Sequence, residues 1–579
     1  MDAKRPVHTK KTQRCKTCEQ ISGRAALRDA VLKDTLSKVQ VDRKIGQSDL
    51  IVSTLLLSAE HDLRKWDSKS AVAKANQAIS FSEKSPLPHF FLAHLNRLTE
   101  KKSFLSALGE YATAIQLSIG NFFIMTTSIG IFLLVLMITF HLCLLTFLLY
   151  WFVYYLPLWV HYAKESLPLS IQGAIHRHVI LGLIVFLLLV LFFLLPPFWF
   201  LWISLLLFWF FYQPQEKRIA VIFLVGLLLF SFLSKPILML LTAKQSYLLD
   251  QMTANQSGNF LWSAPQFNAI EKDWKVPFIK ASYSLQENRF AEADALYKQS
   301  LLENPDEKRL LNNLGNTAFY REQFHEALGY YQKAIDQNPD YVVAHYNMSQ
   351  VHNEMLAFEK GKGKYMEAKN ISQVLTEYYA QSASKYPNHP VIEERFTQRD
   401  LWQNLFLLNL HGPEKPQPIR QLFIGGISLT PFLISIILLS LALYFAYTKL
   451  IRYVSGEFCP TCHKAICVQC RESFTHYNLC GECSTLMITG SNQKVGRLPK
   501  RLRPFFIIPG GGQIVLQKTA LALYMLIPFY FAITLMVVGD NFLTSEYWHL
   551  SISGSPLLPI TVVFVYGIYL TDLYLRRKG

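Results

Sequence analysis

Charged residues are scarce in this chain of 579 residues, since only 17% of them are Asp, Glu, Lys or Arg. Apolar residues make up 51% and aromatic residues 14%, and this composition excludes a purely soluble protein. The net charge is +16. The basic residues do not gather into one face, so we interpret them as charges that flank a membrane and expect no nucleic-acid partner.

The sequence also lacks a signal peptide pattern at its start and cysteines in one long region. Residues 1–20 are charged and have no apolar core, which indicates that they are not a cleavable signal. Cysteine is missing from residues 243–421. Near the N-terminus, Cys15 and Cys18 form a single CxxC, which is half of a tetrahedral zinc site, and we assign it at most a minor role.

Long apolar runs predict a multi-pass membrane protein, because about 20 apolar residues suffice for one crossing. The runs are 122–160, 179–212, 219–241, 422–448, 519–538 and 557–573. We expect one long, tilted helix for the first run. The second contains Pro196 and Pro197, so it is either a hairpin of two short helices or one kinked crossing.

His141 lies inside the first apolar run. An ionisable group within a membrane is a candidate functional residue. Because no carboxylate lies near it in the sequence, we interpret His141 as a neutral histidine that packs and makes a hydrogen bond.

Residues 308–341 carry a spaced pattern of small, aromatic and proline residues. These are Leu314, Gly315, Phe324, Ala327, Tyr331, Ala334 and Pro339. Thirty-four residues earlier the same pattern recurs at Phe290, Ala293, Tyr297, Ser300 and Pro305. The pattern resembles the tetratricopeptide repeat, which implies stacked helix pairs with a concave groove that binds a protein partner. We therefore predict an all-α fold in which an α-solenoid accompanies membrane helices and a small zinc module.

The repeat pattern is weaker on either side of this region. After Pro339, Met348 and Phe358 fit the register, but Gly361, Lys362 and Gly363 are expected to interrupt the second helix of the next unit. A helix near 365–386 is expected to cap the stack. Before the first apolar run, a weaker form of the same spacing indicates either diverged repeats or ordinary amphipathic helices. Its residues are Ala78, Pro86, Phe104, Ala107, Tyr111 and Ala114.

Three CxxC pairs lie within residues 459–483. They are Cys459 with Cys462, Cys467 with Cys470, and Cys480 with Cys483. The outer pairs match the spacing of a zinc ribbon, and His463 and His476 are further local ligands, so we predict one or two structural zinc ions with the pairing left open. Three disulfides are the competing interpretation, but the basic residues that follow favour the reducing cytoplasmic side.

Pro509 and three following glycines predict a tight turn before the last two membrane helices. The segment is not a phosphate-binding loop, because the Gly-Lys-Ser/Thr ending is absent.

These observations divide the chain into seven parts. They are an N-terminal helical domain (1–120), a membrane helix bundle (121–242), the repeat domain (243–421, with clear repeats at about 274–341), a membrane helix (422–450), the zinc module (457–485), a basic linker with the glycine turn (486–516) and two C-terminal membrane helices (517–579). The layout resembles uncharacterised multi-pass membrane proteins of Gram-negative bacteria that carry tetratricopeptide repeats and a C-terminal zinc-ribbon-like module. This resemblance implies a bacterial inner-membrane protein and supplies no activity.

Charge bias places both termini and the zinc module in the cytoplasm. The repeats then face the periplasm if the number of crossings between 121 and 243 is odd. A true hairpin at Pro196 and Pro197 would make it even and keep the repeats in the cytoplasm.

The leading functional hypothesis is a membrane scaffold whose repeats bind protein partners during assembly of an envelope complex, with membrane lipid as its other contact. One alternative is a lipid-linked glycosyltransferase, but the loop after the first apolar run offers only Glu165 as a carboxylate. Another is a transporter or channel, which would need more polar intramembrane residues than His141.

Overall fold

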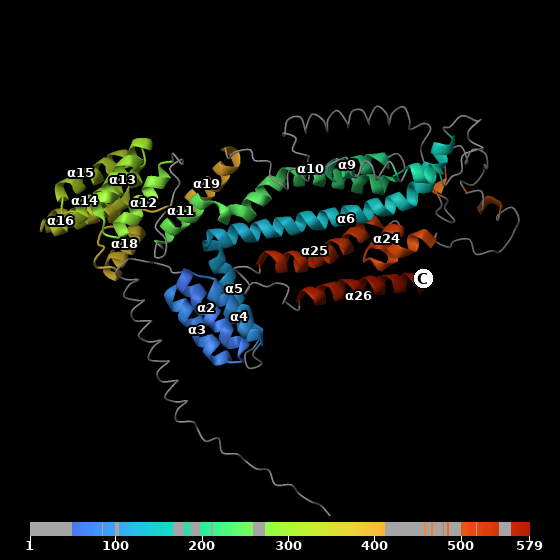
Figure 1. Ribbon diagram of the computed structural model, residues 1–579, viewed down its shortest axis with the longest axis horizontal. Helices are drawn as coiled ribbons and strands as arrows, with labels where there is room; N and C mark the ends of the chain where they lie inside the picture. Colours follow the sequence, from blue (N-terminus) through green and yellow to red (C-terminus); the bar gives the residue numbers. More distant parts are fainter. Residues whose placement is uncertain are drawn as a thin grey trace, which may run out of the picture. The chain divides into compact units, whose positions relative to one another are not determined.

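The computed structural model describes residues 49–83, 85–98, 104–165, 179–184, 186, 197–209, 212–258, 273–411, 457–458, 465–466, 479, 483–485, 500–516, 518–543 and 557–578. The fold is all-α, as predicted (Figure 1). Within these ranges the only strands are β1 (Glu457–Phe458) and β2 (Ala465–Ile466), which pair antiparallel. The chain forms two compact units, one from 1–122 with 244–404 and one from 123–243 with 405–579, and each is described by itself.

The first unit begins with four helices, α2 (Asp49–Arg64), α3 (Ser68–Phe81), α4 (Leu87–Leu98) and α5 (Phe104–Gly120). Small residues form the buried face of α3, which packs on α2 and α4, and the buried face of α5, which packs on α4. Ala71 and Ala78 of α3 are buried, as are Ala107 and Ala114 of α5. Close helix packing at alanines is the feature that the weaker spacing indicated for this region.

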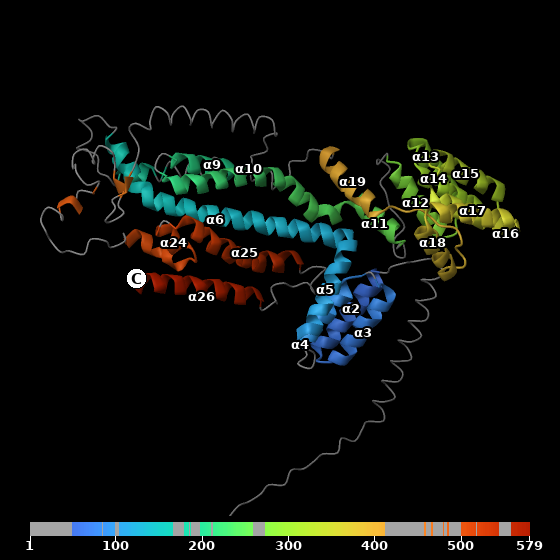
Figure 2. The same cartoon turned by 180° about the vertical axis from the view of Figure 1, so that it is seen from behind.

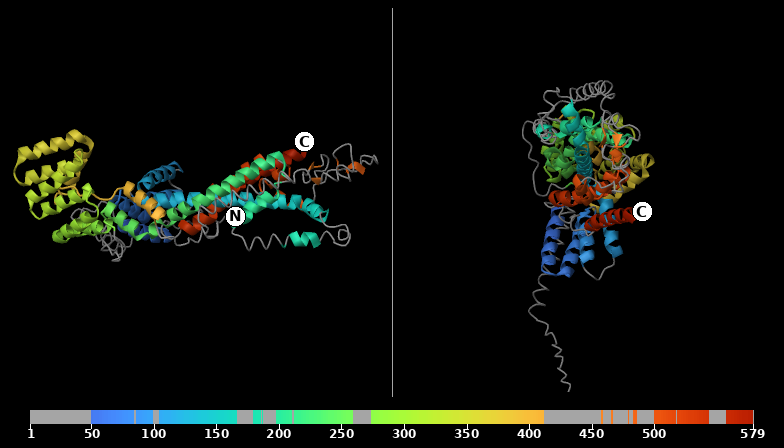
Figure 3. Two further views of the ribbon diagram at one scale, coloured as in Figure 1. Left: turned by 90° about the horizontal axis from the view of Figure 1, so that it is seen from above. Right: turned by 90° about the vertical axis from the view of Figure 1, so that its right-hand side faces the viewer.

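Residues 275–385 form the repeat array of three helix pairs and a final helix. They are α12 (Lys275–Gln286) with α13 (Phe290–Glu303), α14 (Lys308–Tyr320) with α15 (Phe324–Gln337), α16 (Val342–Glu354) with α17 (Phe358–Ile371), and then α18 (Gln373–Lys385). Figure 3 shows these stacked helix pairs, coloured green to yellow, from two further directions. Two more helices flank the array, α11 (Tyr247–Ser257) before it and α19 (Gln398–His411) after it.

The three pairs share one turn. Its central residue has a left-handed φ in each, at Asn288 (+59°), Glu322 (+60°) and Leu356 (+58°), so the backbone itself repeats every 34 residues. In each turn the following amide donates to a carbonyl five residues earlier, for example Gln323 N to Ala318 O at 2.9 Å. Such a bond satisfies a carbonyl at a helix C-terminus. The turn between α2 and α3 is built the same way, with φ +64° at Trp66.

The predicted interruption at Gly361, Lys362 and Gly363 is wrong. Helix α17 runs unbroken through all three, and α18 is a separate helix that begins at Gln373. Gly361 is buried and lies 34 residues after Ala327, where two helices cross and only a small residue fits. Packing at the crossing therefore outweighs the weak helix propensity of glycine.

This correction leads to a test with two glycines of one helix. A Cβ on Gly361 would lie 2.3 Å from Asn353 Oδ1 and 3.1 Å from the Ser349 carbonyl, whereas nothing lies within 4 Å of one on Gly363. We expect Gly361→Leu to lower the stability of the array by about 1–3 kcal/mol through overpacking. Gly363→Leu should raise it by up to about 1 kcal/mol through better helix propensity. Urea unfolding followed by proteolysis of α17 measures both, and equal effects would contradict the assignment of the crossing.

Among the described residues of the second unit, three helices are long and apolar enough to cross a membrane. They belong to α6 (Phe122–Glu165), α10 (Pro214–Thr242) and α25 (Thr519–Leu543), which run side by side in Figures 1 and 2. The first apolar run is indeed one helix, of 44 residues. Short helix α9 (Pro197–Leu207) begins at Pro197 and packs beside α10, and the rest of the proline-containing run, like residues 422–450, lies largely outside the described residues.

Polar contacts tie these apolar helices together. Glu216, three residues into α10, accepts hydrogen bonds from Trp151 Nε1 at 3.0 Å and Tyr155 OH at 2.6 Å, both on α6. Thr146 of α6 and Tyr530 of α25 lie 2.7 Å apart through their hydroxyl oxygens. His141 Nδ1 donates to the Met137 carbonyl at 2.6 Å, and its ring centroid lies 6.2 Å from that of Phe230 on α10, so it packs and makes a hydrogen bond as the sequence indicated.

The glycine turn lies between the 3₁₀ helix η2 (Lys500–Ile507) and α25, with short helix α24 (Gly511–Val515) within it. Gly510 has φ +90°, a conformation that favours glycine. A Cβ on Gly511 would lie 2.0 Å from the Phe505 carbonyl oxygen. The last helix, α26 (Leu557–Lys578), closes over this turn, where Tyr569 OH donates to the Phe506 carbonyl at 2.9 Å.

Candidate functional site

The concave side of the repeat array holds a segment of the chain itself. Residues 388–397, which we call the groove segment, follow α18 and lead into α19 without forming a helix or strand. The first helices of the repeat pairs, together with α11, supply the side chains that hold it. The predicted groove is therefore present, and in this structure it is filled.

Asn347 of α16 binds both main-chain groups of Ile392. Its Oδ1 accepts from the Ile392 amide at 2.7 Å and its Nδ2 donates to the Ile392 carbonyl at 2.9 Å. The same carbonyl also accepts from Asn312 and Asn316 of α14, at 3.0 and 2.9 Å. All three asparagines are fully buried. Since a buried amide without partners is costly, this network fixes the segment in one register.

Asn313 of α14 likewise binds both the amide and the carbonyl of Glu394. Its Oδ1 accepts from the Glu394 amide at 2.9 Å and its Nδ2 donates to the Glu394 carbonyl at 2.8 Å. Asn313 and Asn347 are 34 residues apart, so equivalent positions of two repeats bind residues two apart in the segment. The N–H and C=O of one residue point the same way only in extended backbone, so the groove recognises an extended chain.

Phe396 continues this alternation at the other end of the groove. Its amide donates to Asn255 Oδ1 of α11 at 3.0 Å. Its buried ring lies 4.9 Å from that of Phe278 and 5.9 Å from that of Trp274, measured between centroids. The Arg309 guanidinium lies 5.4 Å from the centre of the Phe396 ring. Residues 392, 394 and 396 thus each face an asparagine.

Charges surround the acidic part of the groove segment. Burial raises the pKa of Glu394, an effect that the charge of Arg309 opposes. Burial also lowers the pKa of Arg309, but its contacts with Glu307 and Asp400 more than offset this, and the guanidinium stays charged. Asp400 lies 2.9 Å from Arg309; burial raises its pKa, but hydrogen bonds from Thr397 and the charge of Arg309 bring it below the ordinary value. Glu393 accepts from Ser282 and pairs with Arg395 at 2.9 Å.

The repeat residues singled out in the sequence pack together the helices that form this groove. Ala293, Tyr297, Ser300, Leu314, Ala327, Tyr331 and Ala334 are all fully buried. Phe290 and Phe324 are the first residues of α13 and α15, and Pro305 and Pro339 lie just beyond the ends of those helices. Gly315 is buried against Tyr331, whose ring would lie 2.5 Å from an added Cβ. Tyr331 in turn donates to Asn316 Oδ1 at 2.7 Å and so supports the asparagine network.

The asparagines were not among the residues singled out from the sequence. The available signal was the recurrence of Asn313 at Asn347 after one repeat length, inside helices where asparagine is disfavoured. Glu216 was missed as well, because its partners Trp151 and Tyr155 are more than 60 residues away in the chain.

Most of the predicted zinc ligands lie outside the described residues. These are Cys459, Cys462, His463, Cys467, Cys470, His476 and Cys480. Cys483 is described and is buried. Strands β1 and β2 pair Phe458 with Ala465, directly before Cys459 and two residues before Cys467. Cys15 and Cys18 also lie outside the described residues.

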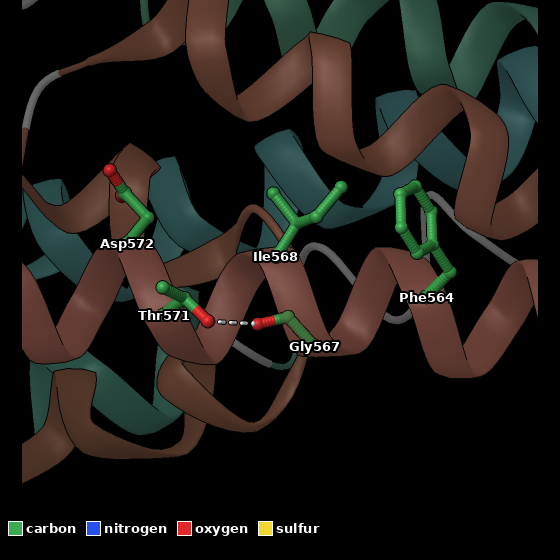
Figure 4. A pocket seen from close by; sticks show the side chains of 5 residues that line it. All are labelled: Phe564, Gly567, Ile568, Thr571 and Asp572. Atoms are coloured by element: carbon green, nitrogen blue, oxygen red, sulfur yellow. Dashed lines mark hydrogen bonds between the residues drawn. The ribbon is translucent and has the colours of Figure 1, made fainter.

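A shallow pocket of about 500 Å³ lies along one side of α26. Figure 4 shows Phe564, Gly567, Ile568, Thr571 and Asp572 lining it. All five come from a single helix, and Thr571 uses its hydroxyl to donate to the Gly567 carbonyl at 2.8 Å. The pocket offers no converging set of polar groups, unlike the groove of the repeats.

Comparison with known proteins agrees with the repeat assignment. The model of the tetratricopeptide repeat family matches residues 309–341, which cover α14 and α15. No curated protein matches the chain.

Proposed function

We propose that this protein is a membrane-embedded, non-enzymatic scaffold that binds protein partners through its repeat array. The observation that carries the proposal is the set of asparagines on the concave side, which bind the main chain of an extended segment rather than particular side chains. A surface of this kind recognises another polypeptide. The tetratricopeptide match supports a role in protein–protein interaction. Three helices in the described part of the chain are long and apolar enough to cross a membrane, and they support anchoring in lipid.

A crosslinking experiment tests the scaffold. A photoreactive amino acid replaces Val374, an exposed residue of α18, and the full chain is irradiated in its native membrane. We expect discrete crosslinked proteins in the parent chain and in Gly329→Arg, which alters an exposed position of α15. They should vanish in Ala327→Arg, which breaks the array. The same products from a broken array, or none from any version, would contradict the proposal.

The resemblance and the charge bias extend this proposal to the bacterial inner membrane, with both termini in the cytoplasm and an envelope complex as the assembled product. Sidedness can be measured with single cysteines at Gln332, on the exposed face of α15, and at Ser551, labelled by an impermeant thiol reagent in spheroplasts. The background lacks the reactive thiols outside the zinc module. Labelling of both sites places the repeats in the periplasm. Protection of the cysteine at 332 alone places them in the cytoplasm and redirects the search for partners.

We also propose that residues 459–483 hold one or two structural zinc ions. The donor set supports this, because two CxxC pairs complete a tetrahedral site, and pairing of β1 with β2 brings together the residues on either side of the first CxxC. The site would shape a small docking surface beside the membrane.

The zinc proposal predicts that Cys459→Ser loses metal. Purified parent protein should contain at least one equivalent of zinc, and the variant should contain less and be cut faster within 459–483. Cleavage of the repeat array should stay unchanged, which is the internal control. Zinc content equal in the two proteins, or absent from both, would contradict the assignment.

A further inference from the structure

The groove segment is a connection between helices rather than a part of one. Helix α18 ends at Lys385 and α19 begins at Gln398, so the intervening residues can leave the groove while both helices stay folded. Pro387 lies in a turn in which the His389 amide donates to the Tyr386 carbonyl at 2.8 Å, and Pro390 has no amide hydrogen and favours extended backbone before it, so neither helix continues into the segment. The segment is therefore already in the conformation in which the asparagines hold it.

The groove holds this segment through both main-chain hydrogen bonds and buried apolar side chains. Ile392 and Glu394 are bound through main-chain amides and carbonyls, and three side chains are deeply buried: Val391, Ile392 and Phe396. Main-chain hydrogen bonds can be made equally well by any extended peptide that enters in the same register. The groove thus selects for extended backbone and for apolar side chains at the positions of Val391, Ile392 and Phe396.

One asparagine binds the resident segment through only one of its two polar side-chain atoms. Asn255 is fully buried and its Oδ1 accepts from the Phe396 amide, but its Nδ2 has no hydrogen-bond partner among the described residues. Asn313 and Asn347 each bind the N–H and the C=O of one residue. A buried donor without an acceptor is unfavourable, so a better-fitting peptide would gain a bond here that the resident segment does not make.

We propose that the groove segment is a resident ligand that an extended segment of a partner protein displaces. This inference rests on the scaffold function and names the partner's chemistry. The incoming segment has aliphatic residues at the positions of Val391 and Ile392 and an aromatic ring at the position of Phe396. The aromatic ring packs against Trp274 and Phe278, and the Arg309 guanidinium lies near its face.

Because its own segment occupies the groove, the array is autoinhibited. While attached, the segment competes at the high effective concentration of a tethered ligand, so a free peptide of the same sequence binds the parent chain weakly. Weakening the resident segment alone should therefore open the groove to a peptide added from solution.

The test uses the full chain in detergent and a fluorescent peptide of residues 386–398. In the Ile392→Pro/Glu394→Pro variant the resident segment loses the two amides that donate to Asn347 and Asn313. We expect the peptide to bind this variant at least 30-fold more tightly than it binds the parent chain, as measured by fluorescence anisotropy. Binding that is equal in both, with the array still folded by circular dichroism, would overturn the proposal.

Matched peptides test the alternation. N-methyl groups at positions 392 and 394 remove the bound amides and should abolish binding to the variant. N-methyl groups at 393 and 395 lie on amides for which no bond to an asparagine is seen, and should leave binding within about threefold of the parent peptide. An equal loss of affinity in both peptides would show that binding does not depend on the bonds from the 392 and 394 amides to Asn347 and Asn313.

A milder variant keeps the test valid if the double proline disturbs folding. Phe396→Ala removes the buried ring from the resident segment, and should raise affinity for the unchanged peptide while a peptide carrying the same change binds poorly. Failure of both variants to admit peptide means that the groove is permanently filled. The crosslinking experiment at α18 does not require an open groove, so it would still test the scaffold function separately.

Discussion

Replacement of Ala327 by arginine is expected to unfold the repeat array. Ala327 is fully buried where α15 crosses its neighbours, in one cluster with Tyr331 and Ala344. A guanidinium at this position would be buried among apolar side chains. Burying an unpaired charge costs several kcal/mol, so we expect a loss of more than about 4 kcal/mol.

A matched substitution two residues away separates charge from position. Gly329 lies on the same helix with nothing within 4 Å of an added Cβ, so Gly329→Arg should keep or slightly raise stability. Both variants are compared by limited proteolysis of residues 275–385 and by circular dichroism. Protease resistance of Ala327→Arg equal to that of Gly329→Arg would remove the assignment of this helix crossing.

The second large effect is expected from Asn347→Ala. This change removes the acceptor of the Ile392 amide and one donor to the Ile392 carbonyl, and leaves a buried amide without its partner. We expect the array to lose about 2–4 kcal/mol, the sum of lost bonds and an unsatisfied group. Hydrogen exchange at Ile392 and Glu394 should accelerate at least tenfold, because both amides depend on the same network.

Gln332→Ala serves as the control for this prediction. Gln332 is an exposed amide on α15 whose side chain bonds Asp336, four residues further along the same helix. Its removal should change stability by no more than about 0.5 kcal/mol and leave exchange in the groove segment unaltered. If Asn347→Ala behaves like Gln332→Ala, the groove segment is not held as described.

The repeat architecture was predictable because each unit carries its own pattern. Small residues at Ala293, Ala327 and Ala334 must lie where helices cross, and a fixed period makes their meaning unambiguous. The second helix of the third unit was predicted to be interrupted because a glycine in a sequence has two possible meanings. At Gly361 its small size satisfies the crossing, while its low helix propensity suggests an interruption, and only the packing of α16 on α17 decides between them.

The groove itself could be predicted, but its occupant could not. Asn313 and Asn347 are one period apart and could have been recognised as polar residues on the inner helices. The groove segment has neither helical nor alternating periodicity, and its partners lie 45 to 141 residues away in the chain. Contacts of that range depend on the path of the chain through space, which no local pattern encodes. The same reason explains why the partners of Glu216 were not foreseen.

The path of the groove segment also affects how the array unfolds. In an ordinary solenoid each repeat touches only its neighbours, so end repeats can fray while central ones persist. Here one stretch of chain is bonded to α11, α12, α14 and α16 together. Loss of one pair breaks bonds that hold the others, and the array should therefore melt in one cooperative step rather than progressively from its ends.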